Sequence, residues 1–158
     1  MKFIVFLLLV LNTLSAVDKE KFSGRWYEIA RTPNKYQKEC TKSYVEYDFV
    51  NKNKVKNICQ TKDNETNKYK GHASLVDKDY LKLRYYLIFT VKYKITYLND
   101  YKTAVVADDK YLWILSREKN INETELEKIL NIIKDHKNFS KLIFSDYAPI
   151  KYTKKKNK

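Results

Sequence analysis

Residues 24–31 read Gly24-Arg25-Trp26-Tyr27-Glu28-Ile29-Ala30-Arg31 and determine how the rest of the chain is interpreted. The aromatic and β-branched content of this stretch predicts a first strand over about 25–32. Because side chains alternate along a strand, Trp26, Glu28 and Ala30 are expected to share one face. If that face is interior, the strand brings a tryptophan, a carboxylate and a small residue into the core.

Downstream of this strand, segments rich in Val, Ile, Tyr and Phe recur at intervals of about a dozen residues between Asn, Asp and Lys clusters. The spacing predicts an antiparallel meander. The further strands are expected at about 41–50, 54–60, 69–76, 81–89, 93–98, 103–107 and 111–117, with tight turns at 51–53 and 77–79.

The strand that begins at Leu81 illustrates the alternation, since its leucines and Tyr85 share one face and Lys82 and Arg84 the other. Eight strands with one apolar face can close into an up-and-down barrel, which removes exposed edges and leaves room for one small ligand. Periodicity alone also allows a β-sandwich.

After Arg117 the period changes, because Leu126, Ile129, Leu130 and Ile133 follow at helical spacing. Asn122 with Glu125 forms a capping pair, so we expect a helix over about 123–137 whose apolar stripe lies against the outside of a barrel wall. One more short strand is expected at 141–147. A basic, disordered tail is expected over 151–158.

The first residues resemble a secretory signal. Lys2 precedes nine apolar residues, Phe3 to Leu11, and Ser15-Ala16 supply the small residues of a cleavage site, whereas nine apolar residues are too few to span a bilayer of about 30 Å. We expect a cleaved signal peptide over 1–16 and one domain over 17–150. No lipid-attachment cysteine follows the apolar run, so the product is expected to be secreted or periplasmic.

Several classes of function are disfavoured by composition. The only histidines, His72 and His136, have no ligand spacing to the cysteines, and two glycines in 158 residues leave no phosphate-binding loop. We therefore expect no enzyme activity, no metal and no cofactor. The net charge of +13 favours anionic partners, although a general bias toward lysine explains it equally well.

Three motifs together resemble the lipocalin family. The first is Gly24-Arg25-Trp26 continuing as Tyr27-Glu28-Ile29-Ala30-Arg31, the second is Asn99-Asp100-Tyr101, and the third is 111–117, read as YLWILSR and ending in Arg117. They occur in the family's order, with the helix directly after the third. The resemblance is to the bacterial lipocalin and apolipoprotein D branch and covers about 22–148. Asn99 departs from the usual Thr or Asp.

The resemblance implies an all-β, eight-stranded antiparallel barrel with one C-terminal helix packed outside and a short final strand. It also bears on Cys40 and Cys59. As the only cysteines of an exported chain they suit a disulfide, with two free buried thiols as the alternative, and this branch carries cysteines at matching positions. Cys40 would then lie in the loop before the second strand and fold back, with Cα atoms about 5–6 Å apart.

The two ends of such a barrel have different expected roles. Trp26 and Arg117 should meet as a cation–π pair at the closed end, where Gly24 and Tyr101 also belong. Ligands should enter at the opposite end, bounded by 33–39, 61–68, 90–92 and 108–110. The expected lining residues are Glu28, Ala30, Val45, Tyr47, Ala73, Leu83, Tyr85, Leu87 and Trp113.

We therefore expect a secreted carrier of a small hydrophobic ligand, a fatty acid or lysophospholipid, that is a monomer or weak homodimer and does not bind nucleic acid. The alternative is a secreted cationic β-protein that acts through its surface on anionic membranes or nucleic acid. Saturable lipid binding with little salt dependence favours the first reading, and salt-sensitive binding of a polyanion favours the second.

Overall fold

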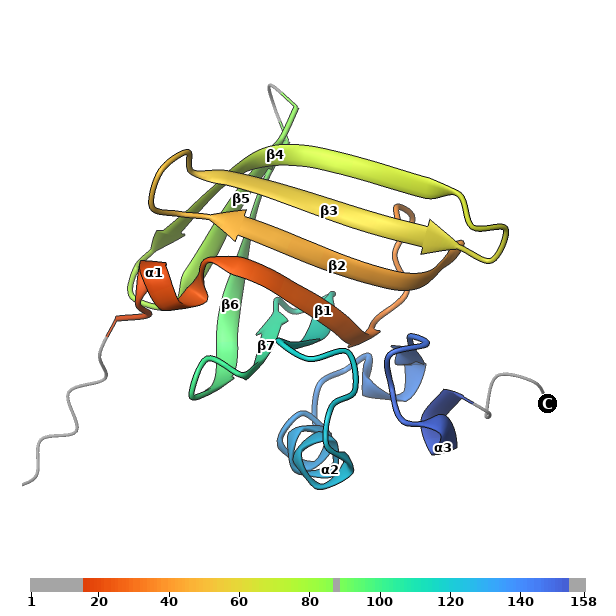
Figure 1. The fold of residues 1–158 in the computed structure, drawn as a ribbon. Coiled ribbons are helices and arrows are strands. Elements are labelled where there is room, and N and C mark those ends of the chain that lie inside the picture. Colours follow the sequence, from red (N-terminus) through yellow and green to blue (C-terminus); the bar gives the residue numbers. More distant parts are fainter. Residues whose placement is uncertain (1–15, 87–88, 154–158) are drawn as a thin grey trace, which may run out of the picture.

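Nine antiparallel strands dominate the computed structural model, which describes residues 16–86 and 89–153 (Figure 1). The strands are β1 (Gly24–Arg31), β2 (Cys40–Asp48), β3 (Lys54–Thr61), β4 (Thr66–Val76), β5 (Tyr80–Tyr85), β6 (Phe89–Asn99), β7 (Thr103–Ala107), β8 (Leu112–Ser116) and β9 (Ile143–Phe144). The helices are α1 (Lys19–Phe22), α2 (Glu123–Ile132) and α3 (Ile150–Thr153), with a 3-10 turn at Phe139–Lys141.

Strands β1 to β8 each pair with the next, and β8 pairs back with β1, so the sheet closes on itself. The predicted eight-stranded barrel is confirmed. Trp26 stands opposite Val45 on β2, and Glu28 stands opposite Leu115 on β8. All of these pairings are antiparallel, which makes the barrel an up-and-down meander.

Strand β9 pairs with the last residues of β1, which β2 no longer pairs with. β2 pairs with β1 only as far as Tyr27, and β9 then pairs with Ala30 and Arg31. The short final strand is confirmed, but it spans 143–144 and not 141–147, because Phe139–Lys141 forms a 3-10 turn ahead of it.

The turns at the α1 end of the barrel follow the sequence signals. Asn53, Asp77 and Asp100 adopt positive φ angles, a backbone conformation that Asn and Asp tolerate better than most residues. At the other end, residues 90–92 were predicted as the connection between two strands, and this prediction was wrong. β5 ends at Tyr85 and β6 begins at Phe89, so residues 90–92 belong to β6. Tyr86, in the turn between them, has a φ angle of 59°. Bulky aromatic residues rarely adopt positive φ angles, so the sequence does not indicate this turn.

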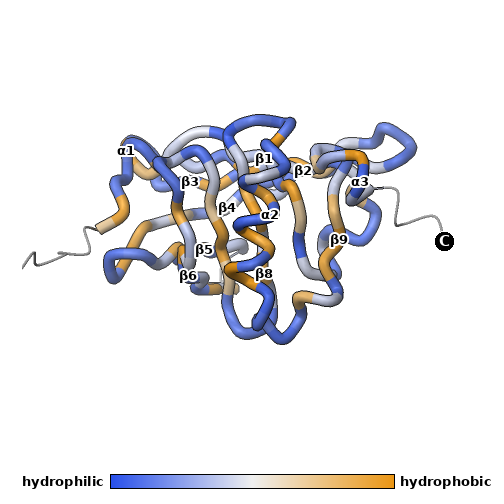
Figure 2. The backbone as a smooth tube through the Cα atoms, turned by 90° about the horizontal axis from the view of Figure 1, so that it is seen from below, coloured by the Kyte–Doolittle hydropathy of each residue, from blue (hydrophilic) through white to orange (hydrophobic). Residues whose placement is uncertain are grey.

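Two apolar clusters lie on the two faces of the sheet. One fills the barrel interior around Trp26, Leu81 and Leu115, and the other lies between the outer wall and α2 around Ile114, Leu126 and Ile129. Figure 2 shows α2 crossing the outside of the barrel over β8. The expected outer position of the helix is confirmed.

Helix α2 is shorter than predicted and is attached differently. The Asn122 side chain caps it by accepting from the backbone N–H groups of Thr124 and Glu125. The Glu125 carboxylate does not return to the cap. It accepts from Tyr97, Asn99 and Thr103 on the barrel wall at 2.6–3.0 Å, so that it fixes the helix to β6 and β7.

The helix ends at Ile132 because the next residues are held to the loop between β7 and β8. The His136 ring contacts the Asp108 carbonyl oxygen at 2.9 Å, and the Asn138 side chain donates to the Lys110 carbonyl at 2.8 Å. These contacts require the chain to turn within 133–138, where the sequence pattern had predicted further helix.

Residues 151–153 do not belong to a disordered tail. They continue α3, in which the Tyr152 ring stacks on Phe144 at 5.0 Å and Lys151 pairs with Glu123 and Glu127 on α2. The expected signal peptide and the lysine run 154–156 lie outside the described residues, apart from Ala16. No described helix combines the length and the apolar character needed to cross a bilayer.

Candidate ligand-binding site

One end of the barrel is sealed by Arg117 and Trp26. The guanidinium carbon lies 3.8 Å from the centroid of the indole, and its nitrogens donate to four backbone carbonyl oxygens, those of Lys21, Ser23, Arg25 and Tyr101. Trp26 is fully buried and donates to the Phe22 carbonyl at 2.9 Å. Burial lowers the pKa of Arg117 to about 10. Each of the three guanidinium nitrogens and the indole nitrogen therefore donates at least one hydrogen bond.

Gly24 and Tyr101 complete the closed end. Gly24 has φ 97°, and a Cβ atom there would lie 3.2 Å from an Arg117 nitrogen, so only glycine lets the guanidinium approach the backbone without strain. The Tyr101 hydroxyl accepts from the Asp18 N–H at 2.8 Å, which fixes the start of α1 across the barrel end.

The inner wall contains most of the expected lining residues. Val45, Tyr47, Ala73 and Leu83 are buried in the interior cluster, and Tyr85 and Trp113 pack against it while remaining partly accessible. Leu87 lies outside the described residues. The alternation of the other strands adds further interior residues, which are Val55, Leu81, Tyr93, Ile95, Ala104, Val106 and Leu115.

Ala30 does not line the interior, which corrects the sequence prediction. A bulge between Glu28 and Ala30 puts one extra residue into β1, so that Ala30 stands opposite Ile114 and packs in the outer cluster under α2. The bulge reverses the alternation of the last residues of the strand. Arg31, which pairs with the inward-facing Trp113, takes the interior position instead.

A buried polar cluster lies at the open end. The Arg31 Nη1 atom donates to the Glu28 carboxylate at 2.8 Å, and both side chains are at most 5% exposed. Gln37, on the loop between β1 and β2, donates to the other Glu28 oxygen at 2.6 Å and accepts from the Trp113 indole at 3.2 Å. Burial raises the pKa of Glu28, while Arg31 opposes the shift.

Two buried polar atoms have no hydrogen-bond partner within the described residues, Arg31 Nε and Ser43 Oγ. Ser43 lies on β2, two residues from Val45 and therefore on the same inner face. Buried donors are normally paired, because an unpaired one costs about 1–3 kcal/mol. The inner wall thus contains hydrogen-bonding capacity that the protein itself does not use. Arg31, Gln37 and Ser43 were not identified from the sequence.

The accessibility of the interior side chains varies along the barrel. Phe22, Trp26 and Leu81 are fully buried at the closed end. Tyr85, Val91 and Trp113, which face the same interior, are partly accessible. Burial raises the pKa of Tyr85 to about 12, and its hydroxyl accepts from the Asn57 amide. The interior is therefore mainly apolar, with the Trp26 and Arg117 plug at one end and the polar cluster and partly accessible Trp113 at the other.

The disulfide between Cys40 and Cys59 is present and joins the start of β2 to β3, with a Cα–Cα distance of 5.4 Å. Cys40 is itself the first strand residue. A bulge follows it, since Cys40 pairs with Thr61 and Lys42 pairs with Gln60. This register shift brings Cys40 close enough to Cys59 for the disulfide. The bridge anchors the loop that carries Gln37. In residues 16–86 and 89–153, no three His, Cys, Asp or Glu side chains are grouped as metal ligands.

Comparison with known proteins gives one consistent result. A family model described as the lipocalin-like domain matches residues 17–145. A protein of Acanthamoeba polyphaga mimivirus described as a lipocalin is 29% identical over 133 residues, 75% of this chain and 78% of its own length. The outer membrane lipoprotein Blc of Vibrio cholerae is 25% identical over 132 residues, 77% of each chain.

Among solved structures, insecticyanin from the tobacco hornworm Manduca sexta superposes with a TM-score of 0.71. The match covers 84% of this chain and 82% of insecticyanin at 17% sequence identity. At that identity the likeness concerns the fold alone.

Proposed function

This chain belongs to the lipocalin family, and we propose that it is an exported carrier whose barrel holds one fatty acid or lysophospholipid. Members of the family generally bind small hydrophobic molecules. The observation that carries the proposal is the interior itself, which is apolar, sealed by the Trp26 and Arg117 plug, and reachable at the end where Trp113 is partly accessible.

The polar cluster at the open end supports an amphipathic ligand. An acyl chain would run along Val45, Ala73 and Leu83 toward the plug, since these side chains offer only apolar contacts. A carboxylate or phosphate would then lie near the mouth, where Arg31 Nε is buried and unpaired in the described chain. Protonation of Glu28 would leave the Arg31 charge available for such an anion, because burial favours the neutral acid.

Export is proposed from the leader-like sequence of residues 1–16. Carriage outside the cytoplasm suits a chain with a structural disulfide, because such bonds persist in oxidising compartments.

The test is calorimetric titration of fatty acids and lysophospholipids into the purified chain and into Ala73→Trp. We expect one ligand per chain for the parent. The added indole at Ala73 would occupy the interior, so affinity should fall at least about tenfold, which corresponds to about 1.4 kcal/mol.

Ser74→Trp is the matched control, because Ser74 is the next residue of β4 and points outward, opposite Lys82. It should bind lipid like the parent. Absence of saturable binding to any lipid, or equal binding by Ala73→Trp, would refute the proposed cavity. Folding of both variants is checked by near-ultraviolet circular dichroism.

A further inference from the structure

The outer surface of β2 to β5 carries a cationic groove of about 820 Å³. Its cations come from the β2–β3 turn and from three neighbouring strands, and they are Lys52, Lys54, Lys56, Lys70 and Arg84, with His72 between them. The groove lies on the outside of the barrel wall, because these side chains alternate with the inward-facing Val55, Ala73 and Leu83. The groove also touches Tyr47 and Val55 of the barrel wall, but the charged side chains point away from the interior.

Strand register concentrates positive charge along this face. Lys56 stands directly opposite Lys70, and His72 stands between Lys54 on one side and Arg84 on the other. Beyond β5, Lys82 is opposite Lys92. Like charges directly opposite each other weaken a sheet, so this arrangement contributes a strong local field and no stability.

Acidic neighbours neutralise only part of the groove. Glu46 is bound by Arg25 at 2.6 Å and by Lys56 at 3.5 Å, and the Asp48 carboxylate accepts from the Asn51 N–H. Lys54, Lys70 and Arg84 are exposed, and none of them makes an ion pair with any residue of the described chain. Three cations thus remain free for an external anion.

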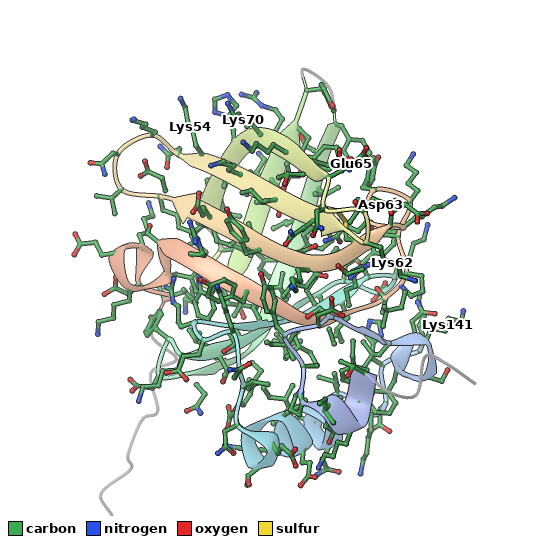
Figure 3. The ribbon with its side chains drawn as sticks, turned by 45° about the vertical axis from the view of Figure 1, so that its right-hand side comes forward. Lys54, Lys62, Asp63, Glu65, Lys70 and Lys141 are labelled. Atoms are coloured by element: carbon green, nitrogen blue, oxygen red, sulfur yellow. A yellow bond between two sulfur atoms is a disulfide. The ribbon has the colours of Figure 1, made fainter. Side chains whose placement is uncertain are left out.

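An exposed aromatic ring lies at the edge of the same groove. Tyr86, two residues after Arg84, lines the groove and is 81% exposed. In Figure 3, Lys54 and Lys70 point to the side of the molecule on which β5 and β6 meet. The free cations and the exposed ring of Tyr86 therefore lie along one groove, on the side of the barrel away from α2 in Figure 1.

We propose that this face, formed by Lys54, Lys70, Arg84 and Tyr86, docks the protein on an anionic lipid bilayer. Basic side chains near an anionic bilayer are attracted to its surface, and amphipathic aromatic rings lie favourably at the level of the headgroups. Docking requires no ligand in the barrel. It brings the open end, at which β5 and β6 join, close to the lipid surface.

A bilayer fits this face better than single-stranded nucleic acid does. Nucleic-acid grooves place aromatic rings along the path of the chain so that successive bases stack on them. Here a single aromatic ring, that of Tyr86, borders the rows of cations. The cations form a broad array over three strands, which suits a surface of headgroups.

The test is sedimentation of the purified chain with vesicles of equal parts phosphatidylglycerol and phosphatidylcholine, and with pure phosphatidylcholine. We expect binding to the anionic vesicles only. The triple variant Lys54→Gln, Lys70→Gln, Arg84→Gln should lose about a hundredfold in partition coefficient, since each basic residue near such a surface contributes about 1 kcal/mol.

The matched control removes three charges from the opposite side. Lys128, Lys134 and Lys137 are exposed on α2 and the turn after it, and their joint replacement by Gln should lower partition by less than about threefold through screened long-range attraction alone. Equal losses in the two triple variants would overturn the proposal, because binding would then follow net charge and not this face.

The contribution of the aromatic ring to docking is tested with Tyr86→Ser. The control is Tyr36→Ser, because Tyr36 is an exposed tyrosine on the loop between β1 and β2. Only the first should lose affinity for anionic vesicles. Equal behaviour of the two would contradict the proposed face, as would binding of a DNA oligonucleotide without binding of vesicles. Fatty-acid titration of the Lys54, Lys70, Arg84 variant should match the parent, so failure of docking and failure of the cavity are told apart.

Discussion

Two arginines, one at each end of the barrel, are surrounded in opposite ways. Arg117 at the closed end stacks on Trp26 and donates to four carbonyl oxygens. Arg31 at the open end pairs with the buried Glu28 and with the carbonyl oxygens of Gln37 and Cys40, and keeps one unpaired buried nitrogen. At Arg117 every guanidinium nitrogen is bonded, which favours stability, whereas the unbonded Arg31 nitrogen leaves a place for a ligand.

The two ends also differ in what holds them. The closed end is held by aromatic packing, since Phe22 lies 4.8 Å from Trp26 and 5.8 Å from Tyr47 between ring centroids. The open end is held by the Cys40–Cys59 disulfide and by a buried ion pair, which is a weak source of stability by itself. The predictions below separate these contributions.

The largest effect is expected at the closed end. Trp26→Ala should lower the free energy of unfolding by about 3–5 kcal/mol, because it removes a fully buried indole from the interior cluster. Urea denaturation followed by tyrosine fluorescence and circular dichroism measures the loss. Molecules that remain folded should still bind lipid, and loss of binding in the folded fraction would show that the plug also contacts ligand.

The disulfide at the open end should contribute somewhat less. Replacing Cys40 and Cys59 together by Ser should cost about 3 kcal/mol, the loop-entropy value for a separation of 19 residues. Thermal unfolding of the double variant, compared with the reduced parent, provides the measurement. If neither treatment lowers the unfolding temperature, the loop that carries Gln37 does not depend on the bridge.

Coupling within the plug should be smaller again. Arg117→Ala, Trp26→Ala and the double variant form a cycle whose interaction energy we expect at about 0.5–2 kcal/mol, the range for a cation over an aromatic face. Denaturant titration of all four proteins gives this value. Strictly additive losses would mean that the two side chains stabilise the closed end independently.

The smallest effect concerns the pH dependence contributed by Glu28. Because burial raises the pKa of Glu28, the folded state holds its proton at pH values where the unfolded state has lost it, so the stability contributed by this group falls as pH rises above the ordinary glutamate pKa. Glu28→Gln removes that fall. The variant should gain stability relative to the parent between acidic and neutral pH, and a constant difference in unfolding free energy would indicate that Glu28 titrates normally.

The barrel could be predicted from sequence because its cues are local. The alternation of apolar residues correctly predicted which side chains of most strands face inward. Asp77 and Asp79 correctly predicted the turn between β4 and β5. Ala30 could not be placed, because a bulge in β1 depends on how Glu28 and Arg31 fit against β8, which no alternating pattern encodes. The turn at Tyr86 was not predicted either, because a bulky aromatic residue rarely adopts a positive φ angle and gives no local turn signal.

The polar part of the site was also beyond the sequence. Glu28 was expected inside, but the sequence did not identify its hydrogen-bond partners. They are Arg31, which the bulge turns inward, and Gln37, which lies on the loop between β1 and β2. Glu125 was taken as a helix cap, but Tyr97, Asn99 and Thr103 attract its carboxylate to the barrel wall. These roles arise from contacts between elements far apart in the chain.

The central claim is that the open end admits ligand and the closed end does not, and the two tryptophans report on the two ends. The measurement is quenching of tryptophan fluorescence by palmitic acid brominated next to its carboxylate, in the parent and in Trp113→Phe, with calorimetry showing that both bind unlabelled palmitic acid. We predict saturable quenching in the parent and almost none in Trp113→Phe, whose remaining Trp26 is fully buried in the plug. Equal quenching of both proteins would place the headgroup at the closed end and contradict the account.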